Sequence, residues 1–272
     1  MKFRINFLLI LIIFSQITCA YRKQNEKVVL TGTTIITALV KDLNENIDVI
    51  NLIPPRQCPG HFDLTPSDAF RVSKADIFII HPYQKYLFKK IKKINKNIKL
   101  EIIKTPDLTI PENYFSALKE MEIILKKFYP KYLDTFERNR IKKIKIIKDK
   151  ISNDKKFLKI IKNKKFKVIS SKFQKKFSQW LGFEVVTTFG APDNLTVKQI
   201  DKIIKIAKER NVSFIISNLA GDHNVTAKIL NKSLNKRIII FSNFPELKPN
   251  KSLFLNLWEY NLKELKNAIK QD

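Results

Sequence analysis

Short apolar runs alternate along the chain with stretches in which apolar residues recur every three or four positions. The runs predict buried strands, over 28–31, 48–53, 77–80 and 100–103. The stretches between them predict helices, over 34–43, 66–73 and 83–93. The same alternation returns after residue 164, with strands over 167–170, 183–187, 213–217 and 237–241 and helices over 173–181, 197–209, 226–234 and 258–269. This order is typical of parallel sheets covered by helices.

The alternation stops in the middle of the chain. A helix is predicted over 112–128, and after Pro130 the segment 131–161 has helical spacing and almost no breaker except residues 152–154. About 30 residues of helix would be about 45 Å long, which suits a connection between two lobes. The sequence therefore predicts an α/β fold of two lobes, each with a parallel sheet flanked by helices, joined by a long backbone helix. The expected divisions are an N-terminal lobe (21–110), a helical region (111–163) and a C-terminal lobe (164–272).

The first 20 residues have the pattern of a secretory signal peptide. Lys2 and Arg4 precede an apolar stretch over 7–14, and small residues follow it. Two processing routes remain open, which are ordinary cleavage after Ala20 and lipoprotein processing before Cys19. Either route predicts an extracytoplasmic protein, in the periplasm or held at the membrane surface by a lipid on Cys19.

Composition narrows the function classes. Hydrophobic residues make up 44% of the 272 residues, which excludes a disordered chain, and the single long apolar run excludes a polytopic membrane protein. The net charge of +27 would suit nucleic acid or an anionic membrane surface. However, the lysines spread along the chain among isoleucine and asparagine and fall on helix faces, and there is no nucleic-acid recognition module. We therefore expect no nucleic-acid partner, and a basic surface-binding protein remains an alternative.

The scarce histidines lie at informative positions. All three follow predicted strands: His61 after 48–53, His81 after 77–80 and His223 after 213–217. Ligands of open parallel sheets bind at the carboxyl ends of strands. Cys58 and Asp222 lie beside two of these histidines, and imidazole, thiolate and carboxylate are the ligand types of zinc. The sequence predicts a metal site formed by Cys58, His61, His81 and His223, or with Asp222 replacing one of them.

The segment 52–68, with a proline-rich loop before His61 and then Thr-Pro-Ser-Asp at 65–68, resembles the solute-binding proteins of zinc and manganese ABC transporters. The resemblance extends to the whole plan of signal, α/β lobe, long helix and α/β lobe. It implies that His61 is the metal ligand of the first lobe. The other two usual histidines are absent, since 105–111 and 170–173 contain none, and for the acidic ligand Asp222 and Glu246 are candidates.

The resemblance implies a receptor that captures Zn(II), or alternatively Mn(II), between two lobes and delivers it to a cognate ABC permease. We expect a monomer and no enzymatic activity. An enzyme with Cys58 as nucleophile is the weaker alternative, because no glycine-rich oxyanion turn is evident. A related receptor that has changed its ligand is also open, because the usual histidine set is incomplete and the Asn218 and 243–246 loops could supply polar contacts.

Overall fold

The computed structural model describes residues 27–248 and 252–269, so the predicted signal peptide and Cys19 lie outside the described residues. The chain forms two parallel four-stranded sheets. The first sheet has the order β2-β1-β3-β4, with β1 (Val29–Thr33), β2 (Val49–Ile53), β3 (Ile77–Ile80) and β4 (Lys99–Ile102). The second has the order β6-β5-β7-β8, with β5 (Lys167–Ser171), β6 (Glu184–Phe189), β7 (Phe214–Asn218) and β8 (Arg237–Phe241). The predicted fold class is confirmed.

Helices cover both sheets and connect them. The first lobe contains α2 (Thr34–Leu43), α3 (Pro66–Ser73) and α4 (Lys85–Ile94). The second contains α8 (Lys175–Leu181), α9 (Val197–Glu209) and α10 (His223–Leu234). Four further helices connect or span the lobes, which are α5 (Pro111–Phe128), α6 (Leu133–Asn153), α7 (Lys155–Lys164) and α11 (Leu253–Ile269). None of the described helices is long and apolar enough to cross a membrane.

Local sequence signals explain several helix ends. Thr65 and Thr196 each form a capping box, in which the threonine hydroxyl accepts a hydrogen bond from the backbone N–H three residues later. Gly182 ends α8 in the left-handed conformation, with φ of 103°. A side chain at Gly182 would meet the backbone of Lys162, so this glycine also permits the close approach of α7 to α8.

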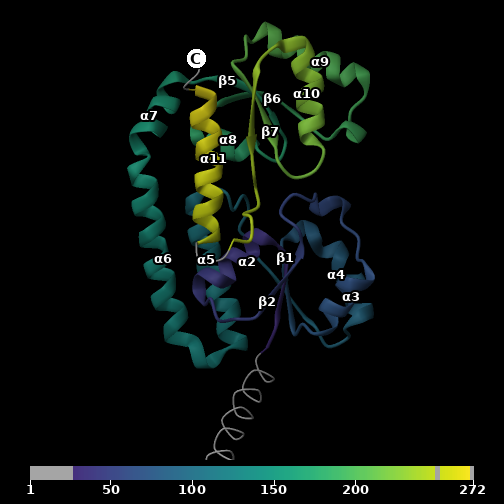
Figure 1. The fold of residues 1–272 in the computed structure, drawn as a ribbon, viewed down its shortest axis with the longest axis vertical. Helices are drawn as coiled ribbons and strands as arrows, with labels where there is room; N and C mark the ends of the chain where they lie inside the picture. Colours follow the sequence, from purple (N-terminus) through teal and green to yellow (C-terminus); the bar gives the residue numbers. More distant parts are fainter. Residues whose placement is uncertain (1–26, 249–251, 270–272) are drawn as a thin grey trace, which may run out of the picture.

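The long connection differs from the prediction. The single helix expected over 131–161 is instead two helices, α6 and α7, which meet at Asp154. The Asp154 carboxylate accepts hydrogen bonds from Trp258 Nε1 at 3.2 Å and from Lys266 Nζ at 3.0 Å, both on α11. The break thus places a carboxylate where it ties the connection to α11, which lies beside α6 and reaches from the second lobe to α2 and α5 of the first (Figure 1).

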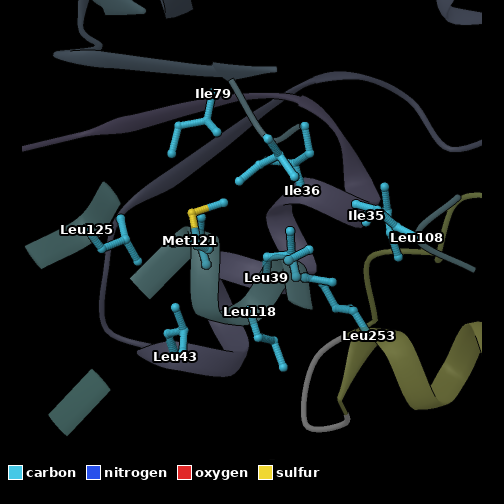
Figure 2. Close-up of a cluster of buried hydrophobic side chains, with 14 of the residues drawn as sticks. Ile35, Ile36, Leu39, Leu43, Ile79, Leu108, Leu118, Met121, Leu125 and Leu253 are labelled. Atoms are coloured by element: carbon cyan, nitrogen blue, oxygen red, sulfur yellow. The ribbon is translucent and has the colours of Figure 1, made fainter. Parts of the chain in front are cut away.

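One hydrophobic core joins the two lobes on this side of the molecule. Leu39 of α2 and Leu118 of α5 pack in the same cluster as Leu253 of α11 (Figure 2). Tyr114 stacks on Phe254 with ring centroids 4.0 Å apart. Because α11 also packs against β8, the C-terminal helix belongs to the cores of both lobes. The packing of α11 in both cores therefore connects the first lobe to the second.

The strand order of each sheet predicts a crevice at the carboxyl ends of its central strands. In each sheet the chain first adds a strand on one side of the starting strand and then continues on its other side. This change of side lies between β1 and β3 in the first sheet and between β5 and β7 in the second. Ligands of open parallel sheets bind at the carboxyl ends of strands beside such a reversal. The residues at these positions are therefore the first place to search for a site.

Candidate functional site

A cavity of about 770 Å³ lies between the two lobes. Its wall comes from the loops that follow the strands of both sheets. These loops contribute Cys58, His61, His81, Tyr83, Lys104, Asp107, Lys172, Phe173, Asn194, Asn218, His223, Asn243 and Phe244, among others. The structure therefore brings Cys58 and all three histidines to one cavity, as the strand-end rule predicts.

His223 is the buried imidazole of the second lobe. It is the first residue of α10, which begins three residues earlier than the sequence predicts, and its side chain is 2% exposed. Its Nδ1 lies 3.1 Å from Ser171 Oγ at the end of β5, and its ring packs edge-on against Phe173. Burial, followed by the positive charge of Lys172, lowers the pKa of His223 to about 4. The ring is therefore neutral at pH 7, and Nε2 is the nitrogen left to bind a ligand.

His81 is the corresponding imidazole of the first lobe. It follows β3 and is 7% exposed, with Nε2 3.3 Å from Thr33 Oγ1 at the end of β1. Its ring stacks on Tyr83, with centroids 5.1 Å apart and planes 10° apart. Burial lowers the pKa of His81 to about 4, so this ring is also neutral at pH 7.

Cys58 and His61 share the loop after β2. His61 ends a short 3-10 turn (Pro59–His61), where its N–H donates to the carbonyl of Cys58 at 3.1 Å, and its side chain is exposed. His61 and His223 line the same cavity. Cys58 is a half-buried free thiol. It lies near Tyr83, whose pKa is raised by burial and by the thiolate charge.

The Cys58 loop touches the opposite lobe directly. The N–H of Gly221 donates to the carbonyl of Arg56 at 3.1 Å, and Arg56 Nε pairs with Glu246 Oε1 at 2.8 Å. Gly221 has φ of 71°, and a side chain there would lie 3.0 Å from Cys58 Cβ. This glycine is thus required both by the backbone conformation and by the close approach of the two loops.

Neither of the two acidic residues predicted as possible metal ligands lines the cavity that contains the histidines. Asp222 is exposed at the N-terminus of α10 and is not among the residues that line the cavity. Glu246 is held by Arg56. The carboxylate that does line the cavity is Asp107, which the sequence analysis does not single out. Within 27–248 and 252–269, no group of three or more His, Cys, Asp and Glu side chains is arranged to hold a metal ion.

Two lysines of the cavity wall and two hydroxyl partners of the histidines are not among the residues predicted from the sequence. Lys104 follows β4, and Lys172 follows β5. The strand-end rule that finds the histidines would have found both lysines, had it been applied to residues other than metal ligands. Thr33 and Ser171 end the central strands and bond to His81 and His223, but a hydroxyl at a strand end has no distinctive sequence signal.

The chain is similar to known periplasmic metal-binding proteins. The family model of the periplasmic zinc-uptake complex component A, ZnuA, matches residues 29–268. A metal-free mutant of a periplasmic metal-binding protein from Candidatus Liberibacter asiaticus has a TM-score of 0.74 and 15% identity, over 89% of this chain and 99% of that one. A manganese-bound mutant of the same protein has a TM-score of 0.71 and 17% identity, over 89% and 99%.

A crystal structure of ZnuA has a TM-score of 0.71 and 13% identity, over 90% of this chain and 99% of that one. At these identities the structural matches show a shared fold. No curated protein sequence matches the chain.

Proposed function

The chain belongs to the ZnuA family of periplasmic metal-binding receptors, and from this premise we propose that it captures Zn(II) outside the cytoplasm and delivers it to a cognate ABC permease. Family membership confirms the resemblance found in the sequence and the extracytoplasmic location. The observation that carries the proposal is the convergence of Cys58, His61 and His223 on one cavity between the lobes.

The chemistry of these donors favours zinc. A metal ligand must be deprotonated, and the pKa of about 4 keeps His223 in the neutral form that binds metals. Thiolate and imidazole suit zinc, whereas manganese prefers carboxylate and water. Relatives with the same fold are described as bound to manganese and to cadmium, so Mn(II) is the second candidate.

The proposed ligands are Cys58 and His61 from the first lobe and His223 from the second. His81 lines the same cavity, but its Nε2 bonds to Thr33, so we assign it as a fourth ligand only after rotation of that ring. The three side chains are not gathered into a metal-binding group in the described structure. Binding would therefore require His61 and Cys58 to move toward His223. Both residues belong to the loop after β2, which already contacts Gly221 of the second lobe.

Calorimetric titration of the mature chain, residues 21–272, with ZnCl₂ tests the proposal. We expect one ion per chain, and a loss of affinity of tenfold or more in Cys58→Ser, His61→Ala and His223→Ala. Asp222→Asn is the matched variant beside His223, and we expect it to bind like the wild type because Asp222 does not line the cavity. Loss of affinity in Asp222→Asn would assign that carboxylate as a ligand. Absence of stoichiometric zinc and manganese binding would overturn the proposal.

Transport by the permease requires a second experiment. A strain that lacks its own zinc receptor, supplied with this chain and its cognate permease, should grow in zinc-depleted medium. The His61→Ala/His223→Ala double variant should not restore growth, although it is exported and folded to the same extent.

A further inference from the structure

The cavity between the lobes is much larger than a metal ion. A water molecule occupies about 30 Å³ of liquid volume, so a cavity of about 770 Å³ has room for far more than one ion. It lies within the range of roughly 300–1,000 Å³ that is usual for organic ligands. Tyr83, Phe173 and Phe244 add apolar wall, which a bare ion does not need.

The charge of the cavity wall favours a ligand that carries negative charge. Lys104 and Lys172 line it, and neither forms an ion pair with a carboxylate among the described residues. Lys172 Nζ lies 5.1 Å from the centroid of the Phe173 ring, and that ring packs against His223, so the ammonium group lies close to the histidine. Asp107 supplies the one carboxylate of the wall. Because α10 begins at His223, the positive end of its helix dipole adds to this field.

The protein donors are too few to complete a zinc site and neutralise it. While His81 Nε2 is bonded to Thr33, Cys58, His61 and His223 offer three donor atoms and one negative charge, whereas zinc in proteins is usually four-coordinate. The remaining donors and negative charge can come from the ligand itself. A metal ion that arrives bound to an anionic carboxylate would present carboxylate oxygens to the lysines and an open coordination position to the histidines.

We propose that the cargo is a chelate, in which a small di- or tricarboxylate holds the divalent metal and binds Lys172 and Lys104 with its free carboxylate oxygens. This inference rests on the proposed metal capture and names the form in which the metal is captured. Charge-assisted hydrogen bonds from the two lysines fix the organic acid. Cys58, His61 and His223 then bind the metal, and the aromatic residues of the wall cover the carbon skeleton.

Equilibrium dialysis with radiolabelled citrate, malate and oxalate tests the proposal, each with and without an equimolar amount of ZnCl₂. We expect the mature chain to retain at least one of these acids only when zinc is present, in a ratio of one acid to one metal. Lys172→Ala and Lys104→Ala should weaken retention of the acid tenfold or more without weakening the calorimetric binding of ZnCl₂ alone, because each substitution removes a positive charge from the cavity wall. Lys176→Ala, an exposed lysine in the same segment that does not line the cavity, should match the wild type in both measurements.

The outcomes separate the inference from the function on which it rests. Zinc binding without retention of any of the three acids would overturn the chelate and leave metal capture intact. Retention that Lys172→Ala and Lys104→Ala do not weaken would overturn the assigned subsite. If an acid binds without metal and zinc does not bind at all, both proposals fail, and the cavity takes an organic anion.

Discussion

Burial of His81 makes the folded state sensitive to mild acid. In the folded chain the pKa of His81 is about 4, against an ordinary value of 6.5 in the unfolded chain. Above pH 6.5 the ring is neutral in both states and contributes no pH dependence. As the pH falls below 6.5, the unfolded chain binds a proton that the folded chain does not accept until about pH 4, so the free energy of unfolding decreases.

The size of the effect follows from the two pKa values. One pKa unit corresponds to about 1.4 kcal/mol, so the proton on His81 lowers the free energy of unfolding by about 2 kcal/mol at pH 5 and about 3 kcal/mol at pH 4. This part of the stability is present above pH 6.5 and is lost as the pH falls toward 4. It is a substantial share of the 5–15 kcal/mol that is typical, in order of magnitude, of folded domains.

Urea unfolding followed by circular dichroism at pH 8 and pH 5, with EDTA present, measures this loss. His81→Gln should be less stable than the wild type at pH 8, because it loses packing against Tyr83, but it should lose about 2 kcal/mol less than the wild type between the two pH values. His61→Gln removes an exposed ring from the same cavity and should show the wild-type loss. Equal losses in His81→Gln and the wild type would refute the assignment of a buried, neutral imidazole.

Three further substitutions test the framework of the site. Gly221→Ala should destabilise the chain by about 1–2 kcal/mol in thermal or urea unfolding, because φ is 71° there, whereas Gly60→Ala has no such conformation and should change stability by less than about 0.5 kcal/mol. Asp42→Ala leaves the buried hydroxyl of Tyr114 without its acceptor and should lower the urea unfolding free energy by about 2–3 kcal/mol, with a smaller loss in Asp42→Asn. Asp154→Ala should accelerate amide hydrogen exchange in α11, and unchanged exchange would show that the carboxylate does not hold that helix.

Much of this fold follows from local sequence patterns. The strands are apolar runs bounded by turns, and the ladder partners confirm parallel pairing, as between Leu30 and Phe78. Thr65 and Thr196 precede helices and form capping boxes, which are local sequence signals of a helix start. Residues 152–154 are the breaker that the sequence shows within the segment 131–161, and the structure ends α6 there, at Asp154, whose carboxylate contacts α11.

The candidate site shows where sequence reasoning stops. Strand-end positions bring His61, His81 and His223 to one cavity, because parallel strands carry their carboxyl ends to one edge. The choice between Asp222 and His223 depends on where α10 begins, and helix ends are uncertain by a few residues from sequence alone. His223 lines the cavity, begins the helix and bonds to Ser171, while Asp222 is exposed and does not line the cavity.

The packing of the lobes restricts how the site can close. Leu253 and Phe254 of α11 belong to the core of the first lobe, and Trp258 and Leu262 of the same helix belong to the core of the second. A large hinge motion would have to remove one of these groups from its core, and burying an aliphatic or aromatic side chain contributes about 1.5–3 kcal/mol each. The loop that carries Cys58 and the segment that carries Lys172 belong to neither of these packed groups. Capture of a ligand should therefore proceed by movement of these loops over an almost fixed pair of sheets.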